Sequence, residues 1–438
     1  MDHQSKAVAI ARTHPKYAFY FECGTGKTIT MLAICHERPM KTLILCPKSI
    51  IHAAWLSDAK HFPSLKIVTP KGANRLERQQ TISAPWDVLI LNYELFKIHY
   101  DDLLDCRVER LICDESSVLK NHSTAVTKKV LNFARDLKET YLLSGTPAPN
   151  NELEYWPQLR CIAPERINKN YWGFASEFFI PLRRKFGRRE FISSWKLKPS
   201  YQTKFMDLFK DRAWFLTKEQ CLDLPEKIDI NRYVELSGHE MNTYNKIFDE
   251  LKAEIGNGTI TINAMAKFLK LRQVTGGMIY HEGKSHNIGE AKLNELEALI
   301  KEITLPVVIW AEFTADLDRI FLKLNSQYRC AILDGRTSEF EKLYAINNLG
   351  ETVDILICHP KAVGHGITLV KASYAIYYSL GYSYENYVQS KDRIHRIGQT
   401  NHCTYIHLLA QDTCDEAVLE AIKLKQSVVE IMKASINA

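Results

Sequence analysis

The chain has 438 residues, which is too long for one ordinary core and fits two or three domains. With 46% apolar and 25% charged residues, it has the composition of an ordinary soluble globular protein and ample side chains to bury. A net charge of +6 permits a polyanionic partner without requiring one.

The cysteine pattern and the hydropathy pattern exclude further classes. The 11 cysteines include no C-x-x-C pair, so neither a disulfide framework nor a zinc site is indicated. The first 11 residues lack the apolar core of a signal peptide, and no apolar run approaches the roughly 20 residues that span a bilayer. We therefore expect a soluble cytoplasmic protein without membrane contact, located in the host cytoplasm if a phage encodes it.

A glutamine near the amino end is a candidate for base recognition. Gln4 stands just before the first predicted helix, and a glutamine amide can pair with the donor and acceptor edge of adenine. An ordinary surface glutamine is the alternative.

The first motif is a candidate phosphate-binding loop between a strand predicted over 17–21 and a helix predicted over 28–38. It reads Phe21-Glu22-Cys23-Gly24-Thr25-Gly26-Lys27-Thr28. The glycines let backbone N–H groups point inward, the lysine ammonium would face the β and γ phosphates, and the threonine hydroxyl would ligate magnesium. Because a phenylalanine replaces the first glycine of the usual pattern, an ordinary glycine turn remains the alternative.

After this loop, short β-rich apolar runs alternate with longer amphipathic stretches. Strands are predicted over 42–46, 66–69, 87–92, 110–113 and 140–143, and helices over 50–61, 94–104, 123–134 and 152–161. This βαβ repetition predicts a parallel sheet covered on both faces. Ligands should bind at the carboxyl ends of its strands.

Two further motifs follow strands of this sheet. The strand over 110–113 runs into Asp114-Glu115-Ser116-Ser117. In a nucleotide site the first carboxylate would hold magnesium through water and the second would polarise the attacking water, whereas a solvated acidic pair is the alternative. Ser144-Gly145-Thr146-Pro147 closes another strand, where its hydroxyls would sense the γ-phosphate, although a plain turn would look the same.

Between residues 172 and 225 the βαβ rhythm stops and the composition becomes aromatic and basic. Five cations stand within seven residues and suit a phosphate backbone: Arg183, Arg184, Lys185, Arg188 and Arg189. A solvated loop or helix face is equally compatible. Helices predicted over 242–252 and 262–273 then form a helical insertion, and 283–287 is the expected flexible boundary.

The βαβ rhythm returns after residue 306. Strands are predicted over 307–310, 330–333, 355–358, 375–379 and 404–409, and helices over 315–324, 338–349, 385–394 and from about 415. Two doubly wound units in one chain suggest a cleft between them, whose opening and closing does work.

The second unit has no phosphate loop of its own but carries a basic string. It reads Gln389-Ser390-Lys391-Asp392-Arg393-Ile394-His395-Arg396-Ile397-Gly398-Gln399. Arg393 and Arg396 are three residues apart on a predicted helix and would share a face. Their planar guanidinium groups suit the charge of a transferring γ-phosphoryl group, and an amphipathic helix with exposed arginines is the alternative.

Together these motifs resemble the superfamily 2 helicase-like motors, and within them the Swi/Snf-type DNA translocases. The likeness covers almost the entire chain, and its most diagnostic string is residues 392–399. The glutamine, the loop, the acidic pair and the Ser-Gly-Thr-Pro motif all have counterparts in the family. Further similar stretches are Leu271-Arg272-Gln273, Leu333-Asp334-Gly335 and the run 361–369.

The resemblance implies two RecA-like domains, with ATP bound to the first, arginine fingers from the second and a duplex gripped across both. The implied catalytic residues are Lys27, Asp114, Glu115, Arg393 and Arg396, with Thr28 and Asp114 on magnesium. The implied ATP contacts are Gln4, Glu22, Cys23, Gly24, Thr25, Gly26, Lys27, Thr28, Gly366 and Gln389. The implied nucleic-acid contacts are Pro47, Lys48, Asn92, Tyr93, Thr146, Gly364 and the basic run.

The expected domain limits follow from these motifs. A RecA-like ATP-binding domain would span 1–165 with a basic and aromatic insertion at 166–225. A helical insertion at 226–285 would precede the second RecA-like domain at 286–438, which ends in a helix. Two departures from the family pattern are Ser117, where histidine is usual, and Thr368, where asparagine is usual.

The expected function is an ATP-dependent motor that translocates along double-stranded DNA and remodels DNA structures or protein–DNA complexes. We expect a monomer acting on double-stranded or branched DNA, similar to the compact copies found in phages and bacteria. A strand-separating DNA or RNA helicase is one alternative. A non-enzymatic, nucleotide-dependent DNA-binding clamp or adaptor is another.

Overall fold

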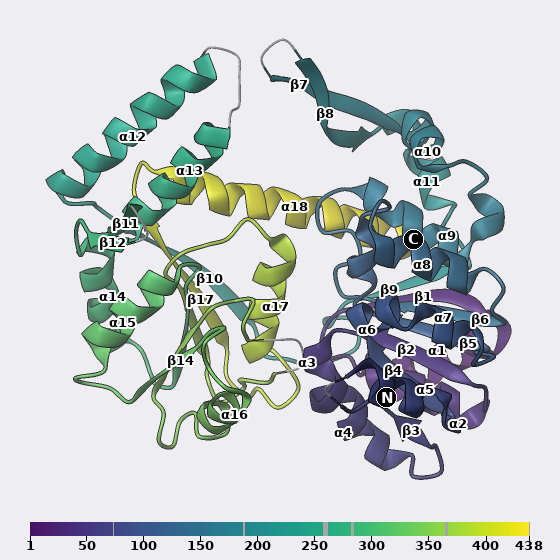
Figure 1. The fold of residues 1–438 in the computed structure, drawn as a ribbon. Coiled ribbons are helices and arrows are strands. Elements are labelled where there is room, and N and C mark those ends of the chain that lie inside the picture. Colours follow the sequence, from purple (N-terminus) through teal and green to yellow (C-terminus); the bar gives the residue numbers. More distant parts are fainter. Residues whose placement is uncertain (73, 187–188, 257–261, 282–283, 364–366, 438) are drawn as a thin grey trace. The chain divides into compact units, whose positions relative to one another are not determined.

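The computed structural model describes residues 1–72, 74–186, 189–256, 262–281, 284–363 and 367–437 (Figure 1). The chain divides into two compact units, the first made mainly of Met1–Leu182 and Ser194–Asp223 and the second mainly of Leu224–Gln426. Each unit is built around a parallel sheet with helices, which confirms the predicted fold class of two doubly wound α/β units.

The sheet of the first unit has the strand order β3-β4-β2-β5-β6-β1-β9. Its strands are β1 (Lys16–Phe21), β2 (Thr42–Cys46), β3 (Ile67–Val68), β4 (Val88–Asn92), β5 (Arg110–Asp114), β6 (Glu139–Leu143) and β9 (Ala213–Leu216). Every neighbouring pair is parallel, so the carboxyl ends of these strands share one edge. Strand β9 falls within the stretch that the sequence assigned to an insertion and was not predicted.

Several helices of the first unit match the prediction, whereas those over 75–83, 171–178 and 202–206 were not predicted and the helix predicted over 94–104 is divided in two. The helices are α1 (Asp2–Thr13), α2 (Lys27–Glu37), α5 (Arg75–Ser83), α6 (Tyr93–Ile98), α7 (Tyr100–Leu104), α8 (Ala125–Ala134), α9 (Tyr155–Ile162), α10 (Tyr171–Phe178) and α11 (Gln202–Met206). The segment predicted as one helix over 50–61 is helical throughout but is not a uniform α-helix. That region is divided into α3 (Lys48–Ile50), a π turn (Ile51–Trp55), α4 (Leu56–Asp58) and a 3-10 turn (Ala59–His61).

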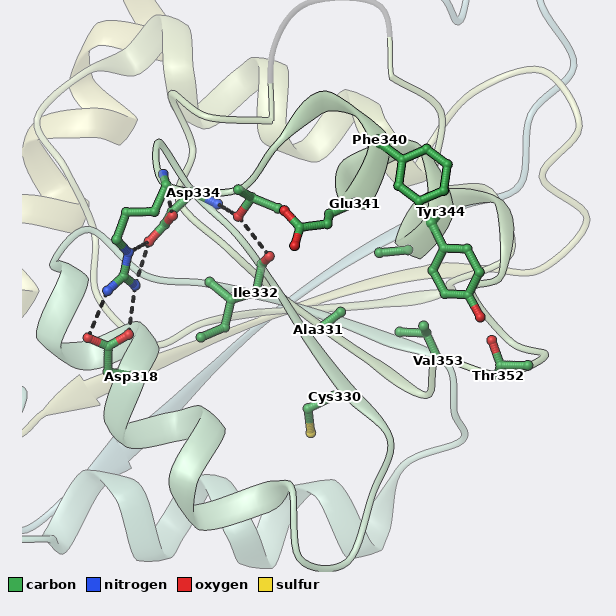
Figure 2. A pocket seen from close by; sticks show the side chains of 13 residues that line it. Asp318, Cys330, Ala331, Ile332, Asp334, Phe340, Glu341, Tyr344, Thr352 and Val353 are labelled. Atoms are coloured by element: carbon green, nitrogen blue, oxygen red, sulfur yellow. Dashed lines mark hydrogen bonds and ion pairs between the residues drawn. The ribbon is translucent and has the colours of Figure 1, made fainter.

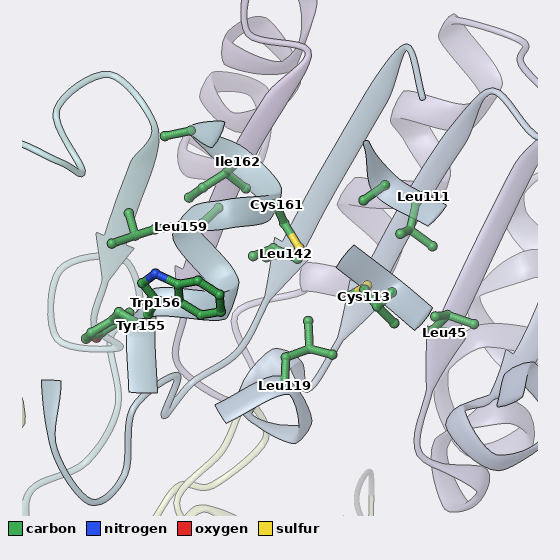
Figure 3. Close-up of a cluster of buried hydrophobic side chains, with 14 of the residues drawn as sticks. Leu45, Leu111, Cys113, Leu119, Leu142, Tyr155, Trp156, Leu159, Cys161 and Ile162 are labelled. Carbon is green, nitrogen blue, oxygen red and sulfur yellow. The ribbon is translucent and has the colours of Figure 1, made fainter. Parts of the chain in front are cut away.

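Alternation along the buried strands places apolar side chains on both faces of the first sheet. In β1, Ala18 and Tyr20 join one core cluster, whereas Phe19 and Phe21 join another. Figure 3 shows part of the first cluster, which brings side chains of α9 against the strands β5 and β6. Two cores on opposite faces are what a doubly wound sheet requires.

The sheet of the second unit has the strand order β10-β17-β16-β13-β15-β14 and is also parallel. Its strands are β10 (Lys227–Val234), β13 (Val307–Trp310), β14 (Cys330–Leu333), β15 (Ile355–Cys358), β16 (Tyr374–Tyr377) and β17 (Cys403–Ala410). Its helices are α12 (Gly238–Gly256), α13 (Ile262–Thr275), α14 (Ala291–Glu302), α15 (Thr314–Leu324), α16 (Glu339–Asn347), α17 (Tyr384–Ile394) and α18 (Cys414–Asn437). Strand β10 was not predicted.

Two connecting segments differ from the expectation. Residues 284–287, expected as a flexible boundary, form strand β12 (Lys284–Asn287), which pairs with β11 (Met278–His281). The basic run is neither a loop nor a helix face, because its described residues lie in the two-stranded sheet of β7 (Phe179–Phe186) and β8 (Arg189–Leu197). Across the described ranges, no helix combines the length and apolar content needed to cross a membrane.

Candidate nucleotide-binding and catalytic site

The predicted phosphate loop is a tight turn between β1 and α2. Gly24 and Gly26 adopt φ angles of 86° and 79°, in the left-handed region that favours glycine. Gly26 is the N-cap of α2. The first turn of this helix therefore directs backbone N–H groups toward the loop, where an anion is favoured.

Side chains around the loop fix its shape. The Lys27 ammonium donates to the carbonyl oxygens of Phe21 and Glu22 at 2.8 and 3.2 Å. The Thr25 hydroxyl donates to the Glu22 carbonyl at 2.9 Å, and the Thr25 carbonyl lies 2.8 Å from Nε2 of the buried His3. His3 was not predicted as a site residue, because a single histidine on a helix is not specific to any one function.

Gln4 lies within α1, next to the phosphate loop, whereas the sequence predicted it just before the first helix. Its Nε2 donates to the Gly26 carbonyl at 3.5 Å, and a cavity of about 450 Å³ beside it is lined in part by Ile29 and Phe62. A Cβ added at Gly26 would lie 2.2 Å from the Gln4 Nε2, so another residue there would displace the Gln4 amide and would also be strained at the positive φ of this position. The adenine role of Gln4 stays a prediction.

The acidic pair stands at the end of β5, separated from β1 by β6 alone. Asp114 is 4% exposed, and its two oxygens accept from the Glu115 backbone N–H at 3.0 Å and from Nε1 of Trp55 at 2.9 Å. Glu115 has φ 51° and ψ 54°, a left-handed conformation that is strained for a glutamate. Strain of this kind is common at active sites, so it supports the catalytic interpretation over a solvated acidic pair.

The charge of the loop lysine, Lys27, affects the pKa of the Asp114 carboxyl. Burial and the neighbouring Glu115 charge raise the pKa of the Asp114 carboxyl to about 6, although the Lys27 charge and the Trp55 hydrogen bond act in the opposite direction. A buried carboxyl beside a second carboxylate is a favourable place for a cation, because the positive charge offsets both causes of the raised pKa.

This pKa predicts a pH dependence for the ligand-free protein. The folded-state pKa lies above the usual Asp value, so the stability linked to Asp114 is present at pH 4 and lost as the pH rises through about 6. Asp114→Asn should remove roughly 2 kcal/mol of this loss between pH 4 and pH 7. Thermal unfolding of both proteins over that range checks it, and parallel stability curves would contradict the prediction.

The Ser144–Pro147 turn follows β6 and packs on the phosphate loop. A Cβ added at Gly145 would lie 3.5 Å from the Cys23 backbone nitrogen and the Glu22 Cα, which is ordinary contact. The phosphate loop, the acidic pair and this turn thus meet at one edge of the first sheet. The sequence predicted this edge, but not the contact.

A magnesium ion fits the residues at this edge. Among the described residues, no group of three or more His, Cys, Asp or Glu side chains is placed to hold a metal. Magnesium needs no such group, because it keeps several waters and binds through one or two protein oxygens together with substrate phosphates. Thr28, in the first turn of α2, and Asp114 supply oxygens of the required kind.

The second unit holds the two predicted arginine fingers, and their placement partly corrects the sequence analysis. Helix α17 ends at Ile394, so Arg396 lies beyond the helix and does not share a helix face with Arg393. Both guanidinium groups nevertheless donate to the Ile367 carbonyl at 3.3 Å. Arg396 also donates to the Thr368 hydroxyl at 3.1 Å. Thr368, which stands where the family usually has asparagine, thus contacts one of the predicted arginine fingers.

Other predicted ATP and DNA contacts are placed as follows. Gln389 is half-buried on α17, whereas Gly364 and Gly366 fall outside the described residues. Pro47 caps α3, Lys48 is exposed, and the Asn92 side chain caps α6 by accepting from Leu95 N–H. Tyr93 and Thr146 are buried, and the Tyr93 hydroxyl donates to the Asp114 carbonyl at 2.8 Å. Side chains of these two residues would need a rearrangement to reach a nucleic acid.

The basic run can be placed only in part. Arg183 is exposed on β7, and Arg184, Lys185 and Arg189 lie in the strands of the same hairpin. Arg188 lies outside the described residues. A nucleic-acid contact through this hairpin stays a prediction.

A cavity of about 780 Å³ in the second unit is not lined by any described residue among the predicted ATP or nucleic-acid contacts. It is bounded by β14 and α16, beside the predicted Leu333-Asp334-Gly335 motif (Figure 2). The Arg336 guanidinium bridges Asp334 and Asp318 there. Asp334 is thus engaged within its own unit.

Comparisons with known proteins decide the family. The model for the SNF2-related domain matches residues 19–281, more than half of the chain, and that for the helicase conserved C-terminal domain matches residues 291–398. The chain belongs to the SNF2-related family. It is therefore an ATPase of the SNF2 helicase family, as the motifs implied.

Relatives of this SNF2-family chain differ in length. A putative protein p41 of Acyrthosiphon pisum secondary endosymbiont phage 1 is 26% identical over 93% of this chain and 92% of its own length. The SWI/SNF-related matrix-associated actin-dependent regulator of chromatin subfamily A member 1 of Mus musculus is 26% identical over 92% of this chain but 40% of its own length, so the chain spans about two fifths of that relative. A solved SWI2/SNF2 ATPase core of Sulfolobus solfataricus in complex with dsDNA is 19% identical, covering 98% of this chain and 90% of that chain with a TM-score of 0.43.

Proposed function

We propose that this SNF2-family ATPase is a motor that couples ATP hydrolysis to translocation along double-stranded DNA. The observation that carries the proposal is the convergence of the phosphate loop, the acidic pair and the Ser144–Pro147 turn at one edge of the first sheet. A mammalian relative is named as a regulator of chromatin, which supports duplex DNA as the track.

The first unit supplies the ATP-hydrolysing groups in this proposal. The Lys27 ammonium leaves its carbonyl partners for the β and γ phosphates, and the N–H groups at the start of α2 hold the phosphate oxygens. Bound magnesium would neutralise charge on the phosphates, held by Thr28 and Asp114. Glu115 orients the attacking water and accepts its proton.

The second unit supplies charge stabilisation in this proposal. Arg393 and Arg396 act on the transferring γ-phosphoryl group only in a closed arrangement of the two domains, so hydrolysis is gated by domain position. Repeated closure while one strand is gripped advances the motor. Affinity for DNA then rests mainly on phosphate contacts, and is salt-sensitive and largely independent of sequence.

A multiple-turnover ATPase assay tests the proposal. Hydrolysis is measured without nucleic acid and with single-stranded DNA, duplex DNA, forked DNA or RNA, with Lys27→Ala as the control for contaminating ATPases. We expect duplex DNA to stimulate turnover and the motor to displace a third strand from a blunt duplex. Stronger stimulation by RNA would overturn the assignment of the track.

Two other results would favour the rival functions. Directional unwinding of a tailed duplex, without displacement of the third strand, would indicate a strand-separating helicase. DNA binding that depends on ATP, without multiple turnovers, would indicate a clamp.

A further inference from the structure

Gln158 on α9 joins three parts of the candidate site. Its side chain is fully buried, and its Oε1 accepts from the Ser116 hydroxyl at 2.9 Å and from the Tyr20 hydroxyl at 3.0 Å. Its Nε2 donates to the Pro147 carbonyl at 2.7 Å. One amide therefore links the residue after Glu115, the strand before the phosphate loop, and the end of the Ser144–Pro147 turn.

The helix that carries this amide is firmly seated. Its side chains Leu159, Cys161 and Ile162 are buried in the core cluster on the sheet (Figure 3). The glutamine uses its acceptor and its donor together, so a displacement of Pro147 is passed to Ser116 through one rigid side chain. Apolar replacements of similar length fill the same space but cannot make this link.

The link ends beside the strained residue of the acidic pair. Glu115 is the left-handed residue that precedes the 3-10 turn Ser116–Lys120, so a shift of Ser116 changes the direction of the Glu115 carboxylate. Ser117, which stands where the family usually has histidine, is also buried. The observed bridge to the Ser144–Pro147 turn, however, starts from Ser116.

We propose that Gln158 is a positioning residue that couples movement of the buried Ser144–Pro147 turn to the orientation of Glu115. This inference rests on the proposed function, because it requires a track that stimulates hydrolysis. Binding of the track displaces this turn, the Gln158 amide follows the Pro147 carbonyl, and the Ser116 hydroxyl follows Gln158. The catalytic glutamate then aligns with the attacking water.

Two variants break the bridge and one matched control leaves it intact. Ser116→Ala removes one hydroxyl, and Gln158→Met keeps the side-chain length but removes both polar ends. Tyr20→Phe removes a hydrogen bond to the same Gln158 oxygen but leaves the connection from Pro147 to Ser116. Ser116→Ala keeps the test valid if Gln158→Met fails to fold.

The measured quantities are kcat with and without duplex DNA, KM for ATP, and the unfolding temperature. Both bridge variants should lower the ratio of DNA-stimulated to basal kcat about tenfold, in the range of typical coupling between sites, while basal kcat and KM change less than twofold. Tyr20→Phe should keep the wild-type ratio. The double variant should lose no more stimulation than the stronger single variant, because both act on one connection.

The outcomes separate this inference from the proposed function. Absence of duplex stimulation in the wild-type protein would overturn the proposed function. A stimulated wild type together with unchanged ratios in both bridge variants would overturn the role of Gln158 alone. An equal loss in Tyr20→Phe would do the same, because it would show a general packing role.

Discussion

Glu115→Gln should lower kcat for ATP hydrolysis by about 10²- to 10⁴-fold, the usual contribution of a general base. The glutamine has the same shape but cannot accept the proton of the attacking water. KM for ATP should change little, because the phosphate loop and Lys27 remain intact. Steady-state kinetics with saturating duplex DNA, and the binding of a fluorescent ATP analogue, measure the two effects separately.

A control glutamate shows whether the loss is specific. Glu339→Gln changes an exposed side chain on α16, where the carboxylate pairs with Lys342 one helical turn away. Its kcat should equal that of the wild-type protein, since an exposed pair of this kind contributes little. Normal turnover in Glu115→Gln would remove Glu115 from its proposed role and leave the general base unassigned.

Arg396→Ala should lower DNA-stimulated kcat by about 10³-fold, the usual effect of removing an arginine finger. Arg396 is the better test of the pair, because Arg393 is only 5% exposed and its removal would also disturb the packing of the second unit. Arg396→Lys should recover little of the lost rate, since an ammonium cannot reproduce a planar, bidentate contact.

The control for this prediction is another arginine of the second unit. Arg329 is exposed and pairs with Asp354. Arg329→Ala therefore removes the same positive charge at a position outside the predicted motif. Its kcat should stay within about twofold of the wild-type value, because an exposed ion pair contributes little. Equal activities of Arg396→Ala and Arg329→Ala would refute the arginine-finger proposal.

Most strands and the order of motifs could be predicted from the sequence. The predicted limits of β2, β13 and β15 match the structure, because these strands are buried on both faces and appear as continuous apolar runs. The limits of β14 match as well, because this partly buried edge strand is also a continuous apolar run. Strand β9 is apolar throughout and was missed because the aromatic and basic composition around it indicated an insertion. Strand β10 was missed because it lies at a sheet edge and alternates polar with apolar residues, so its apolar signal is weak. The exposure along β10 shows this directly.

The clearest correction at the site concerns the carboxyl end of α17. The sequence placed Arg393 and Arg396 on one helix face, but the chain leaves the helix after Ile394. The two guanidinium groups still converge because both donate to the Ile367 carbonyl, which lies far away in the sequence. Spacing rules on a helix apply only while the helix continues.

The sequence by itself determined which chemical groups exist and which strands carry them. Glycines, a lysine and a threonine that adjoin one strand, and two carboxylates that end another, are fixed by local order, and parallel pairing then brings them to one edge. Only the tertiary structure decided which hydrogen-bond partners surround these groups. Trp55 on Asp114, His3 on the phosphate loop and Gln158 between Ser116 and Pro147 come from distant segments, and such contacts leave no local pattern because hydrogen-bond partners are chosen by three-dimensional packing.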